Sequence, residues 1–191
     1  MRCYIYLFRH GQTVDNSNAV FSGWRDSKLD KVGIESAKIV AERLKNKRID
    51  LAFQTKLSRS KDTLRIVLKY HPECKKIITD DRMIERCYGN LQGMSHYEFV
   101  KKNGVKLYDE YHRSYDRAPP IGESVKMVEK RVKSFISDLL KLIKKEKINV
   151  AISAHGNSIR PFRRYFEKLS VEQMMNYYND YDACWIYEVE C

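Results

Sequence analysis

Short apolar runs alternate with amphipathic stretches along most of the chain. An apolar run of about four to eight residues is typical of a buried strand, and apolar residues spaced by three and four are typical of a helix. The runs predict strands over residues 3–8, 50–54, 77–79, 149–154 and 183–189. The amphipathic spacing predicts helices over residues 30–47, 58–70, 95–102, 105–115, 123–145, 158–168 and 171–177.

The stronger helices also show where they begin and end. The clearest amphipathic pattern in the chain covers 123–145. Asp30 is a candidate N-cap for helix 30–47. Helix 58–70 ends before His71-Pro72, because the residue before a proline disfavours helical backbone. Since strands and helices alternate, we expect a three-layer α/β/α fold, with a mostly parallel sheet covered by helices on both faces.

The length and composition fit this fold. A chain of 191 residues suits one domain with a sizeable core. No apolar run approaches the ~20 residues of a membrane-spanning helix, and the N-terminus lacks the pattern of a secretory signal. The five cysteines are scattered without a Cys-x-x-Cys pair. We therefore expect no zinc site and no disulfide framework, and a reducing cytoplasm as the location.

The net charge of +11 is spread along the chain rather than gathered in one segment. A nucleic-acid binder concentrates its basic residues on one face or in a tail and carries a recognition motif, and the sequence shows neither. We predict a solvated basic surface that binds neither nucleic acid nor membrane. Such a surface attracts small anionic substrates.

Two similar polar motifs directly follow predicted strands. Arg9-His10-Gly11 follows strand 3–8, and His155-Gly156-Asn157 follows strand 149–154. Ligands of open α/β sheets bind beyond the carboxyl ends of the strands, so neighbouring strands would place both histidines at one edge. The glycines would let the backbone approach a ligand closely. A single His-Gly pair is more typical of a turn, but two pairs, each with a nearby arginine, favour a site.

Two further residues suit an anion site. Arg59 falls in the first turn of helix 58–70, where free backbone N–H groups already attract anions. Glu85 begins a stretch with two glycines and no helical period, and such a loop acid is equally typical of exposed surface.

Together these residues resemble the signature of the histidine phosphatase superfamily, and in particular its branch of cofactor-dependent phosphoglycerate mutases. The resemblance runs almost the whole chain. It rests on Arg9-His10-Gly11-Gln12-Thr13 with Asn16, Phe21-Ser22-Gly23-Trp24, Ser58-Arg59, Glu85-Arg86-Cys87-Tyr88-Gly89-Asn90-Leu91-Gln92-Gly93, Gly122-Glu123-Ser124 and Ala154-His155-Gly156-Asn157-Ser158-Ile159-Arg160. It implies a single mutase-like domain over 1–191, with an antiparallel C-terminal edge strand and an active-site cap over 85–122.

The resemblance also implies a role for each matched residue. His10 would attack phosphorus and become a phosphohistidine. Arg9, Arg59 and His155 would surround the oxygens of the transferred group. Glu85 would exchange a proton with the leaving and attacking oxygens. The implied substrate-binding residues are Asn16, Ser22, Gly23, Arg86, Tyr88, His96, His112, Arg113, Gly156 and Asn157.

The sequence departs from the mutase pattern in residues that would hold the rest of the substrate. Where that branch has a lysine after Leu-Gln-Gly, this chain has His96. Where the branch has two arginines, this chain has His112-Arg113. Histidines supply a strong positive charge only below about pH 6.5. A segment before Gly122 and a C-terminal tail over the site are also absent relative to that pattern.

The first prediction is a phosphoglycerate mutase that interconverts 2- and 3-phosphoglycerate through a phosphohistidine, primed by 2,3-bisphosphoglycerate and needing no metal. The alternative is a metal-independent phosphatase of small phosphomonoesters, which the departures above favour. A third hypothesis is an inert phosphate- or protein-binding relative, although such a protein would be expected to lack one of the catalytic residues. The tyrosines between 97 and 115 favour internal packing or a homodimer surface.

Overall fold

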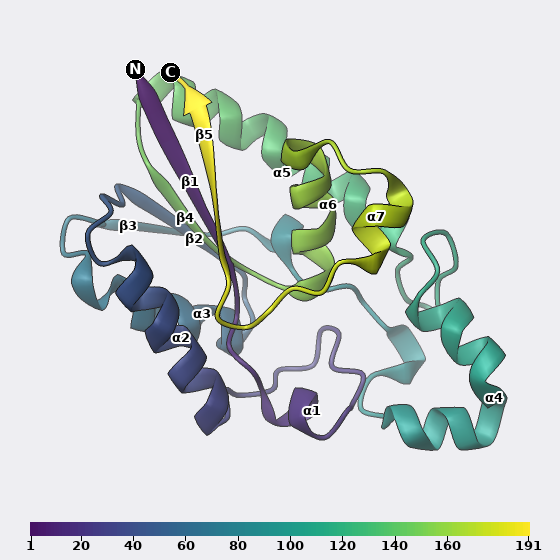
Figure 1. The fold of residues 1–191 in the computed structure, drawn as a ribbon. Coiled ribbons are helices and arrows are strands. Elements are labelled where there is room, and N and C mark those ends of the chain that lie inside the picture. Colours follow the sequence, from purple (N-terminus) through teal and green to yellow (C-terminus); the bar gives the residue numbers. More distant parts are fainter.

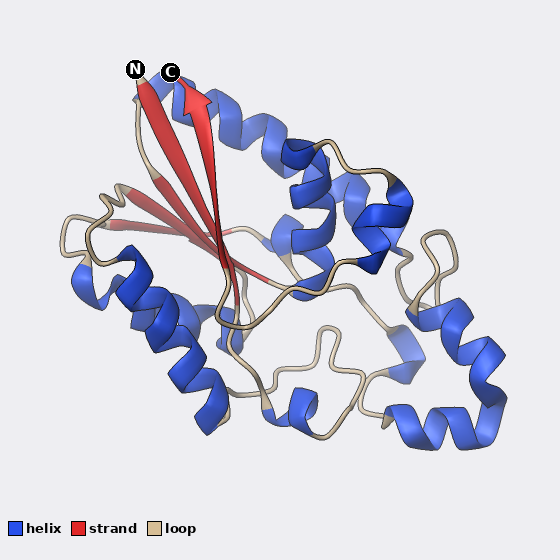
Figure 2. Cartoon of the chain, viewed as in Figure 1, coloured by secondary structure: helices blue, strands red, loops and turns tan.

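A five-stranded sheet forms the centre of the structure, a computed structural model that describes residues 1–191 (Figures 1 and 2). Its strands, in the order β3-β2-β4-β1-β5, are β1 (Arg2–Arg9), β2 (Leu51–Gln54), β3 (Lys76–Thr79), β4 (Val150–Ala154) and β5 (Cys184–Glu190). The first four of these pair in parallel, and β5 runs antiparallel to β1. The predicted sheet, with an antiparallel C-terminal edge strand, is confirmed.

Helices cover both faces of this sheet. They are α2 (Lys31–Leu44) and α3 (Ser58–Val67) on one face, and α5 (Val125–Glu146) and α6 (Gly156–Glu167) on the other (Figure 1). Asp30 caps α2 as predicted, by accepting a hydrogen bond from Gly33 N at 2.7 Å. None of the helices has an apolar stretch long enough to cross a bilayer. The three-layer arrangement predicted from the alternating pattern is confirmed.

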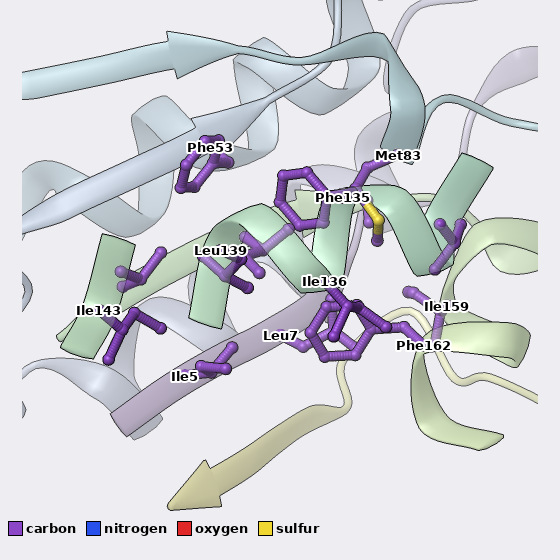
Figure 3. Packing of buried hydrophobic residues seen from close by; sticks show 14 of the residues in the cluster. Ile5, Leu7, Phe53, Met83, Phe135, Ile136, Leu139, Ile143, Ile159 and Phe162 are labelled. Carbon is purple, nitrogen blue, oxygen red and sulfur yellow. The ribbon is translucent and has the colours of Figure 1, made fainter. Parts of the chain in front are cut away.

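Side chains that alternate along β1 build a separate core on each face. Ile5 and Leu7 point into the larger core, which α5 and α6 cover (Figure 3). Tyr6 and Phe8 point into the smaller core, which α2 and α3 cover. Because both faces of the strand are buried, its sequence is a near-continuous apolar run rather than an alternation of apolar and polar residues.

The remaining elements are short or lie beyond the sheet. They are α1 (Val14–Ser17), α4 (His96–His112), α7 (Val171–Asn176) and 3₁₀ turns at Leu68–Tyr70, Asp81–Met83 and Gly89–Leu91. The two helices predicted over 95–102 and 105–115 form one element, α4, which is broken at Gly104 with a φ of 82°. Helix α1 was not predicted, because four residues are too few to show a helical period.

The segment 85–122, here called the cap, packs with Phe21 in a small third core. This core consists of Phe21, Tyr88, Leu91 and Phe99, with Met94, Leu107, Tyr108 and Tyr111 packed against them. Tyr108 and Tyr111 therefore pack internally, which was one of the two roles expected for these tyrosines. Tyr97, in contrast, is 75% exposed. A homodimer surface stays a prediction.

One disulfide corrects the expectation drawn from the cysteine spacing. Cys3 and Cys191 are bonded, while Cys74, Cys87 and Cys184 are free. Antiparallel pairing of β1 with β5 places Cys3 opposite Val189, two residues before Cys191, and Figure 1 shows the two termini side by side. A search for closely spaced cysteines cannot find a pair separated by 188 residues.

We expect Cys191→Ser to lower the melting temperature under non-reducing conditions. The disulfide closes a very long loop and so restricts the unfolded chain, an effect of about 4 kcal/mol or roughly 10 °C for a protein of this size. Differential scanning calorimetry measures the shift, with Cys74→Ser, which removes a free thiol, as the matched control. Equal melting temperatures for oxidised wild type and Cys191→Ser would contradict the prediction, and dithiothreitol should abolish the difference.

Candidate active site

The pairing of β1 with β4 brings the two histidine motifs together. Arg9 lies opposite Ala154 in the register, and His10 N donates to Ala154 O at 2.9 Å. His10 and His155 are the first residues after β1 and β4, and the centroids of their rings are 4.9 Å apart. The structure thus places both motifs at one edge of the sheet, as the strand pattern predicted.

The ring of His10 is held in one orientation. Because a carbonyl oxygen only accepts, Nδ1–H donates to Gly11 O at 2.7 Å, and the lone pair of Nε2 is left free. Burial, together with the charges of Arg59 and Arg9, lowers the pKa of His10 well below its ordinary value. A neutral imidazole with a free ring nitrogen is the form that acts as a nucleophile at neutral pH.

His155 is completely buried beside His10. Its Nε2 bonds Thr55 Oγ1 at 2.8 Å, and its Nδ1 is buried without a hydrogen-bond partner. The bond to Thr55 holds the ring in place beside His10. Burial, Arg59 and His10 lower the pKa of His155 well below its ordinary value, so this ring is also neutral.

Two arginines are fixed near these rings by backbone carbonyls. Arg59, in the first turn of α3 and 1% exposed, donates to Gly23 O and Arg25 O, both at 2.7 Å. Arg9 donates to Asn179 O at 2.8 Å, and its Nε is buried and unpaired. Guanidinium groups remain charged even when buried, so the two side chains give the site a positive potential suited to an anion.

The glycine after His10 serves a different purpose from the one expected. A Cβ on Gly11 would lie 2.1 Å from Gly33 O in the first turn of α2. The close approach is therefore between this loop and α2, not between the loop and a ligand. At Gly156 a Cβ would lie 3.5 Å from the Arg9 guanidinium, an ordinary contact.

Glu85 is an internal residue rather than an exposed loop acid. It is 8% exposed, and its Oε1 accepts from Arg86 N at 2.7 Å and from Asn157 N at 3.2 Å. Its carbonyl oxygen accepts from Trp24 Nε1 at 2.7 Å and from Arg131 Nη2 at 3.0 Å. Backbone and side chain are thus both fixed, and one carboxylate oxygen remains for a ligand.

A pocket of about 550 Å³ opens over these groups. Every predicted site residue lines it except two, His155 and Arg86. His155 is completely buried beside His10. Arg86 is fully buried, donates to Tyr111 O and lies over the Tyr88 ring at 4.4 Å. The structure therefore does not support a substrate-binding role for Arg86 in this pocket.

The cap side of the pocket includes His96 and His112, two of the residues that depart from the mutase pattern. Burial lowers the pKa of His96, and burial together with His96 and Arg86 lowers the pKa of His112 to about 3. Both rings are therefore neutral at pH 7, and His112 stays neutral well below pH 6.5, so they do not replace the lysine and arginine of the mutase pattern. Arg113 lines the rim and is exposed, with Asp109 at 3.5 Å.

Several lining residues were not selected from the sequence. Asn179 and Tyr181 belong to the loop before β5, and Arg9 lies over the Tyr181 ring at 4.0 Å. Arg160 in α6 donates to the carbonyls of Met174 and Met175. Arg160 stands one helical turn after Asn157, a spacing that could have indicated its place. The loop residues carry no periodic signal.

Ligand atoms of His10, Glu85 and His155 lie within 4.8 Å of one another, a spacing that could hold a metal ion. The nearby charges of Arg9 and Arg59 oppose a cation at this point and favour an anion. The arrangement is therefore better suited to a phosphate group: a neutral nucleophile, fixed guanidinium donors and one carboxyl group.

Known proteins resemble this chain in sequence and in fold. The family model described as the histidine phosphatase superfamily (branch 1) matches residues 5–191. The 2,3-bisphosphoglycerate-dependent phosphoglycerate mutase of Parvibaculum lavamentivorans is 38% identical over 176 residues, which cover 90% of this chain and 83% of that protein. Bacillus stearothermophilus YhfR has a TM-score of 0.85 at 23% identity, covering 96% and 90% of the two chains. The alpha-ribazole phosphatase from Shigella flexneri has a TM-score of 0.80 at 23% identity, covering 97% and 89%.

We expect the free energy of unfolding to fall as the pH drops from 6.5 toward 4. The unfolded state binds protons at its histidines below about pH 6.5, whereas His112 stays neutral in the folded state until about pH 3. The stabilisation is thus complete above pH 6.5 and is lost as the pH falls. Each such histidine contributes up to about 1.4 kcal/mol per pH unit.

Urea unfolding of His112→Gln across this pH range tests the contribution of one ring. We expect the free energy of unfolding of this variant to change less steeply with pH than that of wild type, by an amount that corresponds to about one proton. Tyr108→Phe, which alters a neighbour of His112 without removing a histidine, is the matched control. An unchanged slope in His112→Gln would refute the assignment.

Proposed function

We propose that this chain, which belongs to the histidine phosphatase superfamily, hydrolyses small phosphomonoesters through a phosphohistidine at His10. Members of the superfamily are phosphotransferases or phosphatases, and this chain is such an enzyme. The observation that carries the proposal is the neutral, oriented imidazole of His10, with Nε2 free and two fixed arginines beside it. The positive potential of the pocket and the net charge of +11 favour a small anionic substrate.

In the first half of the reaction the lone pair of His10 Nε2 attacks phosphorus. The P–N bond forms as the bond from phosphorus to the ester oxygen breaks. Arg9, Arg59 and His155 would surround the oxygens of the transferring group and stabilise the charge on them. Glu85, as the general acid, gives a proton to the leaving oxygen, so that a neutral alcohol departs.

In the second half, water attacks the phosphohistidine. Glu85, now a carboxylate, takes a proton from the water as the P–O bond forms and the P–N bond breaks. The electron pair returns to Nε2, inorganic phosphate leaves, and His10 and Glu85 are restored to their starting forms. The fixed Oε1 of Glu85 orients the carboxyl group for both transfers.

Phosphoglycerate mutase activity, the first prediction from the sequence, is the second candidate. The 38% identical relative named for it favours this activity, and 2,3-bisphosphoglycerate would then be the primer. A mutase must also hold the carboxylate and the second oxygen of phosphoglycerate while it excludes water. The neutral His96 and His112 are poorly suited to a carboxylate, so the geometry favours hydrolysis. The cytoplasmic location stays a prediction.

Incubation with 3-phosphoglycerate, with and without 2,3-bisphosphoglycerate, separates the two candidates. We expect inorganic phosphate in both reactions and little 2-phosphoglycerate, as measured by a phosphate assay and an enolase-coupled assay. Conversion to 2-phosphoglycerate that requires the bisphosphate would show the mutase instead. His10→Asn should remove both products and any acid-labile phosphoprotein, and turnover by this variant would refute the nucleophile.

We expect Glu85→Gln to lower kcat by about 10²- to 10⁴-fold on an alkyl phosphate, because the amide cannot protonate the leaving alkoxide. The loss should be much smaller in the phosphorylation step with 4-nitrophenyl phosphate, whose leaving group needs no proton. Rapid-quench measurement of the phosphoprotein isolates that step. Glu172→Gln, an exposed change in α7, is the control. Equal losses on both substrates would contradict an acid role for Glu85.

A further inference from the structure

Four rings form a continuous surface on the cap side of the pocket, here called the cap wall. Its members are Phe21, Tyr88, His96 and His112, and all four line the pocket that contains His10. The ring of Phe21 lies 4.1 Å from that of His96 and 5.0 Å from that of Tyr88. The rings of His96 and His112 are 5.0 Å apart. His96 and His112 are half-buried and present their rings to the pocket, where the rest of a bound substrate must lie, and the buried rings of Phe21 and Tyr88 pack behind them.

The four rings of the cap wall carry no positive charge at pH 7, and the charges nearest to His112 belong to Arg86, Arg113 and Arg160. Both of its histidines are neutral at pH 7, for the reasons given above. Arg86 lies over the Tyr88 ring, outside the pocket lining, and Arg160 donates to two backbone carbonyls. Arg113 stands exposed at the rim beside Asp109. A carboxylate or second phosphate against this wall would lose hydration without gaining a dedicated ion pair.

Three buried polar atoms among the lining residues have no partner in the protein. One is Arg9 Nε, beside His10, and the other two are Nδ1 of His112 and Oγ of Ser22. Buried polar atoms are nearly always hydrogen-bonded, so a ligand group is expected to satisfy them. A hydroxyl or carbonyl can do so without bringing a charge to the wall.

We propose that the leaving group is a neutral alcohol bearing a flat ring, which packs on the cap wall while its phosphate lies at His10. This inference rests on the proposed function and names the substrate class of the same site. The cap wall then selects against phosphate esters whose alcohol carries a carboxylate, such as phosphoglycerate. Stacking on aromatic faces provides the selectivity, because the ring gains contacts that a short polar alcohol lacks.

The test compares kcat/KM for benzyl phosphate, glycerol 3-phosphate and 3-phosphoglycerate. All three are alkyl esters whose leaving oxygen needs a proton, so the comparison reports on the wall rather than on leaving-group reactivity. We expect benzyl phosphate to be preferred over each of the others by at least about tenfold. Equal values, or a preference for 3-phosphoglycerate, would overturn the inference. Wild-type protein alone decides this comparison.

Adding a positive charge to the cap wall tests the inference from the opposite direction. We expect His96→Lys to shift the ratio of kcat/KM toward 3-phosphoglycerate by about tenfold. Tyr97→Lys adds the same charge one residue away at an exposed position outside the pocket, and should leave the ratio unchanged. Thermal melting confirms that both variants fold. A folded His96→Lys variant with the wild-type ratio would overturn the inference.

Phosphoprotein formation separates this inference from the proposed function. Acid-labile phosphate on His10 from all three esters, with equal kcat/KM values, would overturn the cap-wall inference and leave the hydrolase intact. Absence of phosphoprotein from every ester, in wild type and in Glu85→Gln, together with absence of turnover, would overturn both.

Discussion

The register between β1 and β4 is the constraint on which the site depends. A shift of one residue would turn Ile5 and Leu7 toward the core now built around Tyr6 and Phe8, and would separate His10 from His155. Because a different set of helices covers each face, side chains of different volume and shape hold the strand in place. Packing far from the pocket thus fixes the distance between the two imidazoles.

Hydrogen bonds also fix helix α3 to strand β4. Ser60 Oγ donates to Ser153 O at 2.8 Å, and Ser153 Oγ donates to Ser60 O at 2.9 Å. Ser60 Oγ also accepts from Thr55 N at 3.0 Å. These bonds position Arg59, the neighbour of Ser60, together with Thr55, the partner of His155. Two buried serines therefore connect the arginine and histidine parts of the site to one strand.

Burial of the arginines and histidines together gives the pocket its chemistry. Taking a guanidinium out of water is costly, and backbone carbonyls from separate loops offset the cost for Arg59 and Arg9. Their charges in turn disfavour protonation of the neighbouring rings. The same groups that attract a phosphate thus keep the nucleophile neutral, and no separate base is needed to activate it.

Local patterns allowed much of this arrangement to be predicted from the sequence. The strands, the main helices and the meeting of two His-Gly motifs depend on periodicity and on the general geometry of parallel sheets. What could not be predicted depends on contacts between distant segments. The disulfide of Cys3 requires knowledge that β5 pairs with β1, and the place of Tyr181 in the pocket depends on an aperiodic loop.

The charge state of the histidines could not be predicted from the sequence either, because burial decides whether a histidine is cationic or neutral. His112 is neutral because of the packing of the cap, and Arg86 is withdrawn from the pocket by the same packing.

The two halves of the pocket have separate structural support. The strand ends and α3 hold the groups around phosphorus, whereas Phe21 and Tyr88 of the cap wall belong to a small core with no buried residue in common with the sheet cores. Glu85 stands at the junction, yet Arg131 of α5 fixes its backbone by donating to the carbonyls of Ile84 and Glu85. Since α5 packs on the sheet, the proton-transferring carboxyl group is positioned from the sheet side. Residues of the cap wall can therefore differ between relatives, and with them the alcohol that is accepted, while the geometry of phosphoryl transfer is retained.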